Sequence, residues 1–117
     1  MRSVGLILLA SLLVPVAAPA AVDTIEGEVL DLACYIPKHA KGPAHKQCAK
    51  TCAENGMPLG LLTDEGTVYL LYPKHGKEQA FDSVKALAGE RAKIRGTTSE
   101  RSGIKGLEVH EAVADED

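Results

Sequence analysis

Five short stretches with the apolar spacing of β-strands constrain the fold of this chain most strongly. The first, residues 24–34, suits a strand with a bulge or a close backbone approach at its glycine. Two apolar runs at 59–62 and 67–72 are joined by the turn sequence TDEG, so they predict a hairpin. Apolar residues alternate again on both sides of Ser102-Gly103, and these two stretches predict a second hairpin.

A helical pattern separates the two hairpins. Within residues 77–90, Phe81, Val84 and Leu87 recur at helical spacing, and Gly89 is a stop signal. The order is therefore strand, cysteine-bearing segment, hairpin, helix and hairpin, which is the order of an OB-fold barrel. We predict a mainly β chain with two helices, folded as a five-stranded OB-fold-like barrel with an inserted cysteine-bearing helix.

The two ends of the chain differ from the domain between them. Arg2, a following apolar run and the small residues APA at 18–20 predict a secretory signal peptide over residues 1–21. We therefore expect a periplasmic or secreted protein that has no membrane span after the signal is cleaved. The remaining boundaries are predicted as an OB-fold-like domain at 22–113, a Cys/His insert within it at 34–56, and an acidic tail at 114–117.

Composition argues against a nucleic-acid partner. Removing the first 21 residues leaves 12 Lys and Arg against 16 Asp and Glu, a formal charge of −4 on about 96 residues. Phe81 is the only phenylalanine, there are three tyrosines, and tryptophan is absent. Such a surface has neither the positive charge that neutralises phosphates nor the aromatic platforms on which bases stack.

The stretch CYIPKHAKGPAHKQCAKTC, residues 34–52, holds all three cysteines and two of the four histidines. Helix formers after a proline predict a helix over 44–54. On that helix His45, Cys48 and Cys52 are spaced i, i+3 and i+7, which places them on one face. Cys34 ends the predicted first strand, and we expect it to reach the same point from the barrel.

Three sulfurs and one imidazole form a ligand set that suits a tetrahedral metal ion. Zinc is the usual ion of such sites, and Cu(I) also accepts thiolates. His39, in the loop before the predicted helix, is the alternative imidazole ligand. The spacing C-x13-C-x3-C does not contain the paired C-x2-C knuckles of the strongest zinc motifs.

A structural disulfide competes with the metal for the same cysteines. Export to an oxidising compartment favours a bridge from Cys34 to Cys48 or Cys52, which would stabilise the domain by about 3 kcal/mol. The bridge leaves one thiol over, whereas the metal accounts for three cysteines and a histidine. Thiol redox chemistry or intermolecular pairing is the third interpretation, and the sequence leaves all three open.

Two kinds of chemistry are disfavoured by the spacing. Covalent haem attachment needs C-x-x-C-H, but three residues separate Cys48 from Cys52 and an alanine follows. No orienting carboxylate or oxyanion donor can be assigned to a cysteine nucleophile, so we expect no enzymatic activity. The leading expectation is an exported small metal-binding protein. The alternative is a disulfide-stapled, non-catalytic interaction module that presents the loop PKHAKGP to a periplasmic protein.

The chain also resembles a known group of proteins along nearly its whole mature length. It is similar to the small exported bacterial OB-fold-like proteins that carry a cysteine- and histidine-containing insert after the first strand. The resemblance implies the barrel and the insert. The matching stretches are GEVLDLACY at 27–35, GLLTDEGTVYLLYP at 60–73 and AKIRGTTSERSGIKGLEVHEA at 92–112.

Overall fold

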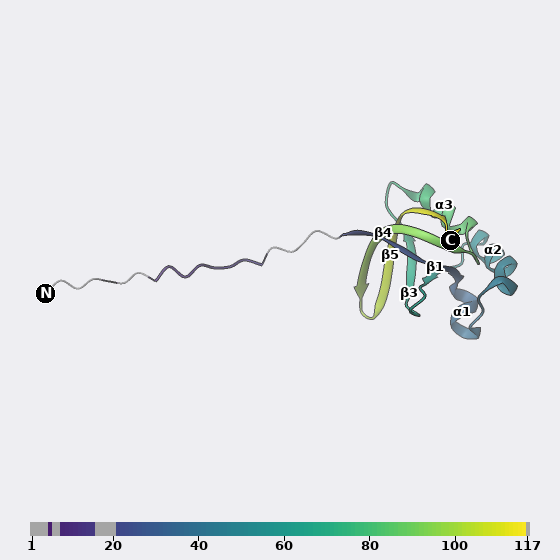
Figure 1. Ribbon diagram of the computed structural model, residues 1–117, viewed down its shortest axis with the longest axis horizontal. Helices are drawn as coiled ribbons and strands as arrows, with labels where there is room; N and C mark the ends of the chain where they lie inside the picture. The colour runs from purple at the N-terminus through teal and green to yellow at the C-terminus, as the bar shows by residue number, and fades with distance from the viewer. Residues whose placement is uncertain (1–4, 6–7, 16–20, 117) are drawn as a thin grey trace.

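A computed structural model of the chain describes residues 5, 8–15 and 21–116. Five strands close into a barrel in the order β1-β2-β3-β5-β4, which confirms the predicted OB-fold-like architecture (Figure 1). The elements are β1 (Val22–Asp31), α1 (Leu32–Lys38), the 3-10 turn η1 (Pro43–His45), α2 (Lys46–Glu54), β2 (Leu59–Leu62), β3 (Val68–Pro73), α3 (Glu78–Ala86), β4 (Arg91–Arg101) and β5 (Ile104–Ala114).

Strand β1 closes the barrel because it pairs with two neighbours in succession. Its first part runs antiparallel to β4, and its last part, from Glu28 to Asp31, runs antiparallel to β2. Gly27 lies at this transition, where a Cβ atom would stand 2.2 Å from the carbonyl oxygen of Leu62. The close backbone approach predicted for this glycine is therefore confirmed, and the strand can bend from one neighbour to the other.

Both predicted hairpins and the helix between them are confirmed. Strands β2 and β3 form the first hairpin, and β4 and β5 form the second around Ser102-Gly103. Both turn residues have positive φ, 53° and 82°, as a tight hairpin turn requires. Strand β3 then pairs in parallel with β5, which completes the barrel.

The core fills the barrel and extends under two helices. Helix α3 contributes the fully buried Val84, and α2 contributes Ala49 and Ala53. The core cluster is Val29, Ala49, Ala53, Leu59, Leu61, Leu71, Val84, Ala88, Ala92, Ile94, Leu107, Val109 and Ala112. Because α2 packs through two alanines, its backbone lies close to the barrel and its other face remains outside.

The structure corrects the prediction for the first strand. We expected residues 24–34 to be extended and Cys34 to end the strand, but β1 ends at Asp31 and α1 follows. The described residues therefore contain three α-helices rather than two. The Asp31 side chain accepts a hydrogen bond of 3.0 Å from the Ala33 N–H and caps the new helix. His39 ends the helix in the left-handed conformation.

The predicted helix over 44–54 also begins later than expected. A 3-10 turn occupies Pro43–His45, and α2 starts at Lys46, so His45 precedes the α-helix instead of lying within it. The Gly42 N–H donates to the Glu28 carboxylate at 2.9 Å, which holds this loop against β1.

The N-terminal segment lies away from the barrel over residues 8–15, which are exposed and have no regular secondary structure (Figure 1). The predicted cleavage pattern at 18–20 lies outside the described residues, and the signal peptide stays a prediction. Within the described part of the chain, no helix is long and apolar enough to cross a membrane. At the other end, the Asp115 N–H donates to the Arg91 carbonyl at 3.0 Å, and Asp117 lies outside the described residues.

Candidate functional site

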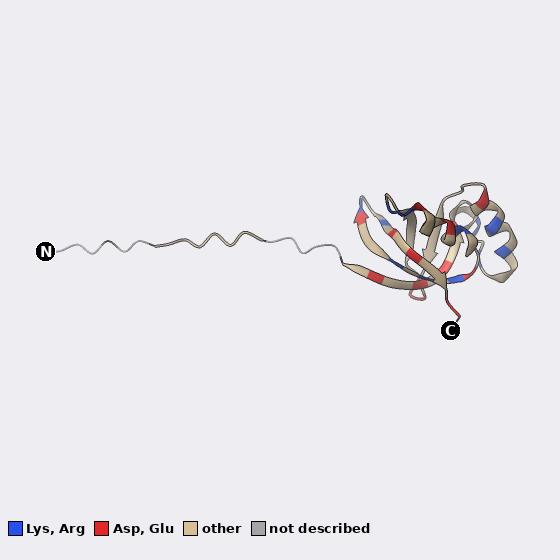
Figure 2. Ribbon diagram, turned by 90° about the horizontal axis from the view of Figure 1, so that it is seen from above, with Lys and Arg blue, Asp and Glu red and all other residues tan. Residues whose placement is uncertain are grey.

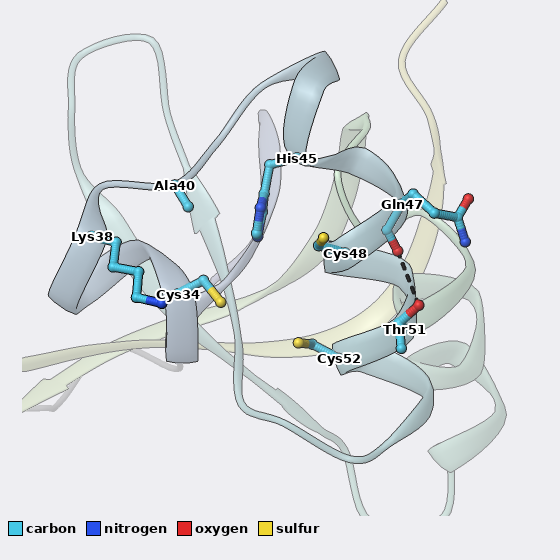
Figure 3. Close-up of a pocket in the computed structure, with 8 residues that line it drawn as sticks. All are labelled: Cys34, Lys38, Ala40, His45, Gln47, Cys48, Thr51 and Cys52. Carbon is cyan, nitrogen blue, oxygen red and sulfur yellow. Dashed lines mark hydrogen bonds between the residues drawn. The ribbon is translucent and has the colours of Figure 1, made fainter.

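Helices α1 and α2 form the two walls of one pocket beside the barrel. Cys34 projects from α1, His45 from the turn before α2, and Cys48 and Cys52 from α2. Figure 3 shows the three sulfurs and the imidazole directed into the same space. The pocket is lined by Cys34, Lys38, Ala40, His45, Gln47, Cys48, Thr51 and Cys52.

A buried aspartate that the sequence reasoning missed lies beneath this pocket. The Asp31 side chain has no solvent exposure, and its Oδ2 atom is 3.6 Å from the Nε2 atom of His45. That distance permits an ion pair with a protonated imidazole but is too long for a hydrogen bond. In the described part of the chain these are the two buried side-chain polar atoms without a hydrogen-bond partner.

Such unpartnered atoms are costly and are uncommon in native proteins. Leaving a buried donor or acceptor unsatisfied costs about 1–3 kcal/mol, and more for a charged group. A bound ion is one established reason for such atoms. Here the two atoms face each other, so one cation between them would satisfy both.

The donor atoms of Asp31, Cys34 and His45 all lie within 4.8 Å of one another. Zinc binds oxygen and nitrogen at about 2.0–2.2 Å and sulfur at about 2.3 Å, so tetrahedral ligand atoms are separated by roughly 3.5 Å. The Asp31 and His45 atoms, 3.6 Å apart, already have this spacing. The Cys34 sulfur would have to approach them by at most about 1.3 Å.

The Asp31 carboxylate also controls the two half-buried thiols. The neighbouring Asp31 carboxylate is the main cause that raises the pKa of Cys52 to about 11, and burial adds to it. The same carboxylate raises the pKa of Cys34. Both thiols therefore hold their protons at neutral pH when no metal competes for the sulfur.

The pKa of Asp31 itself is lowered despite its burial. Burial acts to raise this pKa, but the thiols of Cys52 and Cys34, the Ala33 N–H and His45 together outweigh it. The carboxylate is therefore ionised at neutral pH. A buried negative charge that faces an imidazole and two thiols is an electrostatic environment that favours a cation.

The structure places the predicted ligands as follows. Cys34, His45, Cys48 and Cys52 all line the pocket, but the tightest group joins Cys34 and His45 with Asp31. Cys34 and Cys52 are half-buried, while Cys48 is exposed. The predicted set of three cysteines and His45 stays a prediction. Asp31 was detectable as a helix N-cap in the sequence DLAC, but the strand pattern concealed it.

His39, the alternative imidazole ligand, is the residue that ends α1. It is exposed, and its ring centroid is 5.4 Å from that of Tyr35. It belongs neither to the group around Asp31 nor to the lining of the pocket.

The three cysteines are free in this structure, with no disulfide between them. The sulfurs of Cys34 and Cys52 are nevertheless directed toward each other from α1 and α2 (Figure 3). Of the two bridges predicted from the sequence, Cys34–Cys52 is therefore the one that the arrangement of α1 and α2 would favour.

Two lysines fix the helix that carries Cys48 and Cys52. Lys46 and Lys50 bind the Glu90 carboxylate at 2.9 and 2.8 Å, and Lys50 also donates to the Ala86 carbonyl at 2.6 Å. Hydrogen bonds from both lysines lower the pKa of Glu90 to about 2. These contacts tie α2 to the end of α3 and the start of β4.

Charge is distributed unevenly between the insert and the barrel. Residues 32–53 contain four lysines and no acidic residue, although the chain as a whole has more acidic than basic residues. Figure 2 shows acidic residues along the barrel strands and basic residues on the helices at the end opposite the N-terminal segment. Lys38 acts to lower the pKa of Cys34, but the Asp31 carboxylate and burial outweigh it.

No known protein-family description matches the chain, and no curated protein is significantly similar to it. The chemistry of the pocket is therefore the basis for assigning a function.

Proposed function

We propose that this chain is a small exported metal-binding protein whose site lies between α1 and α2. The observation that carries the proposal is the pair of buried, unpartnered atoms, Asp31 Oδ2 and His45 Nε2, in one group with the Cys34 sulfur. A metal ion satisfies both atoms, and it gives the clustered thiols of the insert a common function.

The mixture of donors favours a zinc-type divalent ion over Cu(I). Zinc binds carboxylate oxygen, imidazole nitrogen and thiolate sulfur, whereas Cu(I) selects soft sulfur donors. Asp31 would contribute oxygen, His45 nitrogen and Cys34 sulfur, and a second cysteine of α2 would complete four-fold coordination. Without Asp31 the residual set of cysteines and histidine would suit either metal equally well.

Export is part of the proposal and is supported by the positive, apolar and small-residue regions of the first 21 residues. Expression in a bacterial host with fractionation tests it, because the exported protein should lose residues 1–20 or 1–21. A full-length mass in the cytoplasmic fraction would contradict export.

A disulfide-stapled interaction module is the second candidate. The proximity of the Cys34 and Cys52 thiols favours it, since a bridge there would pin α2 to α1. It explains two of the cysteines but provides no hydrogen-bond partner for Asp31 Oδ2 or His45 Nε2. The metal site explains these atoms as well, and for that reason we prefer it.

One sample distinguishes the two candidates. The unreduced protein is analysed for metal by mass spectrometry, and its thiols are titrated before and after addition of a strong chelator. The metal site predicts about one bound ion per chain, with the exposed Cys48 thiol reactive at once and the two ligand thiols reactive only after chelation, so that three thiols react in total. One reactive thiol and no bound metal would support the disulfide module instead.

A matched pair of histidine variants localises the site. His45→Ala should abolish stoichiometric zinc binding, whereas His75→Ala, which changes an exposed histidine outside this pocket, should leave binding unchanged. Equal zinc binding by both variants would show that His45 is not a ligand of the ion.

A further inference from the structure

The three cysteines of the pocket are not equivalent. Cys34 and Cys52 are half-buried and both interact with Asp31, but Cys48 is exposed. Cys48 lies one turn before Cys52 on α2, and its sulfur is directed into the same pocket (Figure 3). The pocket therefore has an inner group of donors and one thiol at its rim.

The inner group alone is sufficient for a tetrahedral ion. Asp31, Cys34 and His45 provide three donors. The half-buried Cys52, whose sulfur is directed into the same pocket (Figure 3), would provide the fourth. Structural zinc sites are closed by four protein ligands, and a fifth donor has no place in them. Cys48 is thus a fifth donor, which is not needed to hold the ion in the site.

We infer that Cys48 is an exchange ligand, through which a zinc-type ion enters and leaves a site formed by Asp31, Cys34, His45 and Cys52. The chain is then a carrier that passes its metal to an acceptor, and the ion is not a permanent structural component. This inference rests on the proposed function and concerns only the movement of the ion.

The helix geometry provides a short path for this exchange. Residues four apart on one face of a helix have Cβ atoms about 5–6 Å apart, so Cys48 can bind an ion still held by Cys52. The Cys48 sulfur forms a bond to the metal and releases its proton to water. The displaced inner donor leaves the metal, and no electron is transferred in the step.

The exposed side of the pocket defines the chemistry of the acceptor. An incoming ligand must reach the ion beside Cys48, and it must compete with thiolate and imidazole donors. The acceptor is therefore a protein site with cysteine or histidine ligands of its own. Such a site can replace the ligands of the carrier one at a time, so the ion is never released free into water.

The test compares three variants of the full mature protein, Cys48→Ser, Cys52→Ser and Gln47→Ala. Cobalt(II) replaces zinc as a spectroscopic probe, because the intensity of its sulfur-to-metal charge-transfer band reports the number of bound thiolates. Zinc release is then followed after mixing with excess 4-(2-pyridylazo)resorcinol, a coloured chelator. Gln47 lines the same rim and is the control for a general disturbance of the pocket.

Cys48→Ser should keep the two-thiolate spectrum and the zinc affinity, but release zinc at least about tenfold more slowly, a change of about 1.4 kcal/mol in the barrier. Cys52→Ser should lose one thiolate and bind zinc at least about tenfold more weakly. Gln47→Ala should match the wild type in both measurements. Because Cys48 is exposed, its replacement should leave the circular dichroism spectrum unchanged.

Two results would overturn the inference while leaving the proposed function intact. If Cys48→Ser loses a thiolate from the cobalt spectrum, Cys48 is a permanent ligand. If its zinc release is as fast as that of the wild type, Cys48 has no role in exchange. Failure of the wild-type protein to bind either metal would overturn the proposed function itself, and the exchange role with it.

Discussion

Replacing Asp31 with asparagine removes the buried negative charge of the site but keeps the cap of α1. Asparagine caps helices about as well as aspartate, and its Oδ1 can still accept the Ala33 N–H. We therefore expect the free energy of unfolding of the metal-free variant to lie within about 1 kcal/mol of the wild-type value. The main effect should appear only when zinc is present.

The size of the effect of Asp31→Asn on zinc binding follows from the loss of one charged ligand. We expect zinc affinity to fall by about 100-fold, the upper end of the range seen when supporting groups of metal sites are replaced. With zinc at 1,000 times the wild-type Kd, the stabilisation of the folded state falls from about 4.1 to about 1.4 kcal/mol. For a domain of this size the difference corresponds to roughly 10–20 °C in Tm.

Thermal melts with and without zinc, followed by circular dichroism, measure this directly. Asp82→Asn is the matched control, because Asp82 is an exposed aspartate on α3 outside the pocket. The control should retain the full zinc-induced rise in Tm. An equal rise for Asp31→Asn would refute the reasoning, since Asp31 would then neither bind the ion nor contribute its charge.

Three further predictions concern other parts of the molecule. His45→Ala should abolish the zinc-induced rise in Tm, and retention of that rise would place the ion elsewhere. Glu90 has its pKa lowered from 4.5 to about 2, so its ion pairs stabilise the fold above pH 4.5 and are lost as pH falls from 4.5 towards 2. Glu90→Gln should remove this loss of stability at low pH, which is worth about 1 kcal/mol at a partly exposed site. Urea titrations in which the variant and the wild type lose the same unfolding free energy below pH 4.5 would contradict the prediction. Gly27→Ala should destabilise the barrel by about 3 kcal/mol, because the alanine Cβ would lie 2.2 Å from the Leu62 carbonyl oxygen. A urea unfolding midpoint equal to that of the wild type would show that the close approach is unimportant.

The barrel was predictable because its signals are local. Alternating apolar residues define the strands, and the turns at Gly66 and Ser102-Gly103 require the positive φ that their sequences suggest. Gly27 of the first strand also makes the close backbone approach that its sequence position predicts. Each of these features is set by residues close together in the chain, so no knowledge of the tertiary structure was needed.

The end of the first strand was not predictable in the same way. The apolar residues of LDLAC fit a strand as well as a helix, and Pro37 argued against a helix that nevertheless extends through it. The Asp31 cap decided between the two conformations. As a result, Cys34 lies on α1 and faces α2, and does not extend from the barrel wall.

The composition of the site depended on tertiary structure. The helical spacing of Cys48 and Cys52 was visible in the sequence, but their different exposure was not, because it depends on how α1 and α2 are placed around the pocket. Asp31 is recognisable in the sequence as a possible N-cap, but its burial is not, because it depends on how the end of β1 packs in the folded protein. A buried acidic residue next to a cysteine cluster is identified by burial, which sequence patterns do not report.

The most direct test of the central claim is X-ray absorption at the zinc edge of the protein purified without added metal. We predict about one zinc ion per chain, with sulfur ligands at about 2.3 Å and nitrogen or oxygen ligands at about 2.0–2.1 Å in equal numbers. A sample without zinc, or a zinc ion whose first shell contains no sulfur, would contradict the metal site between α1 and α2.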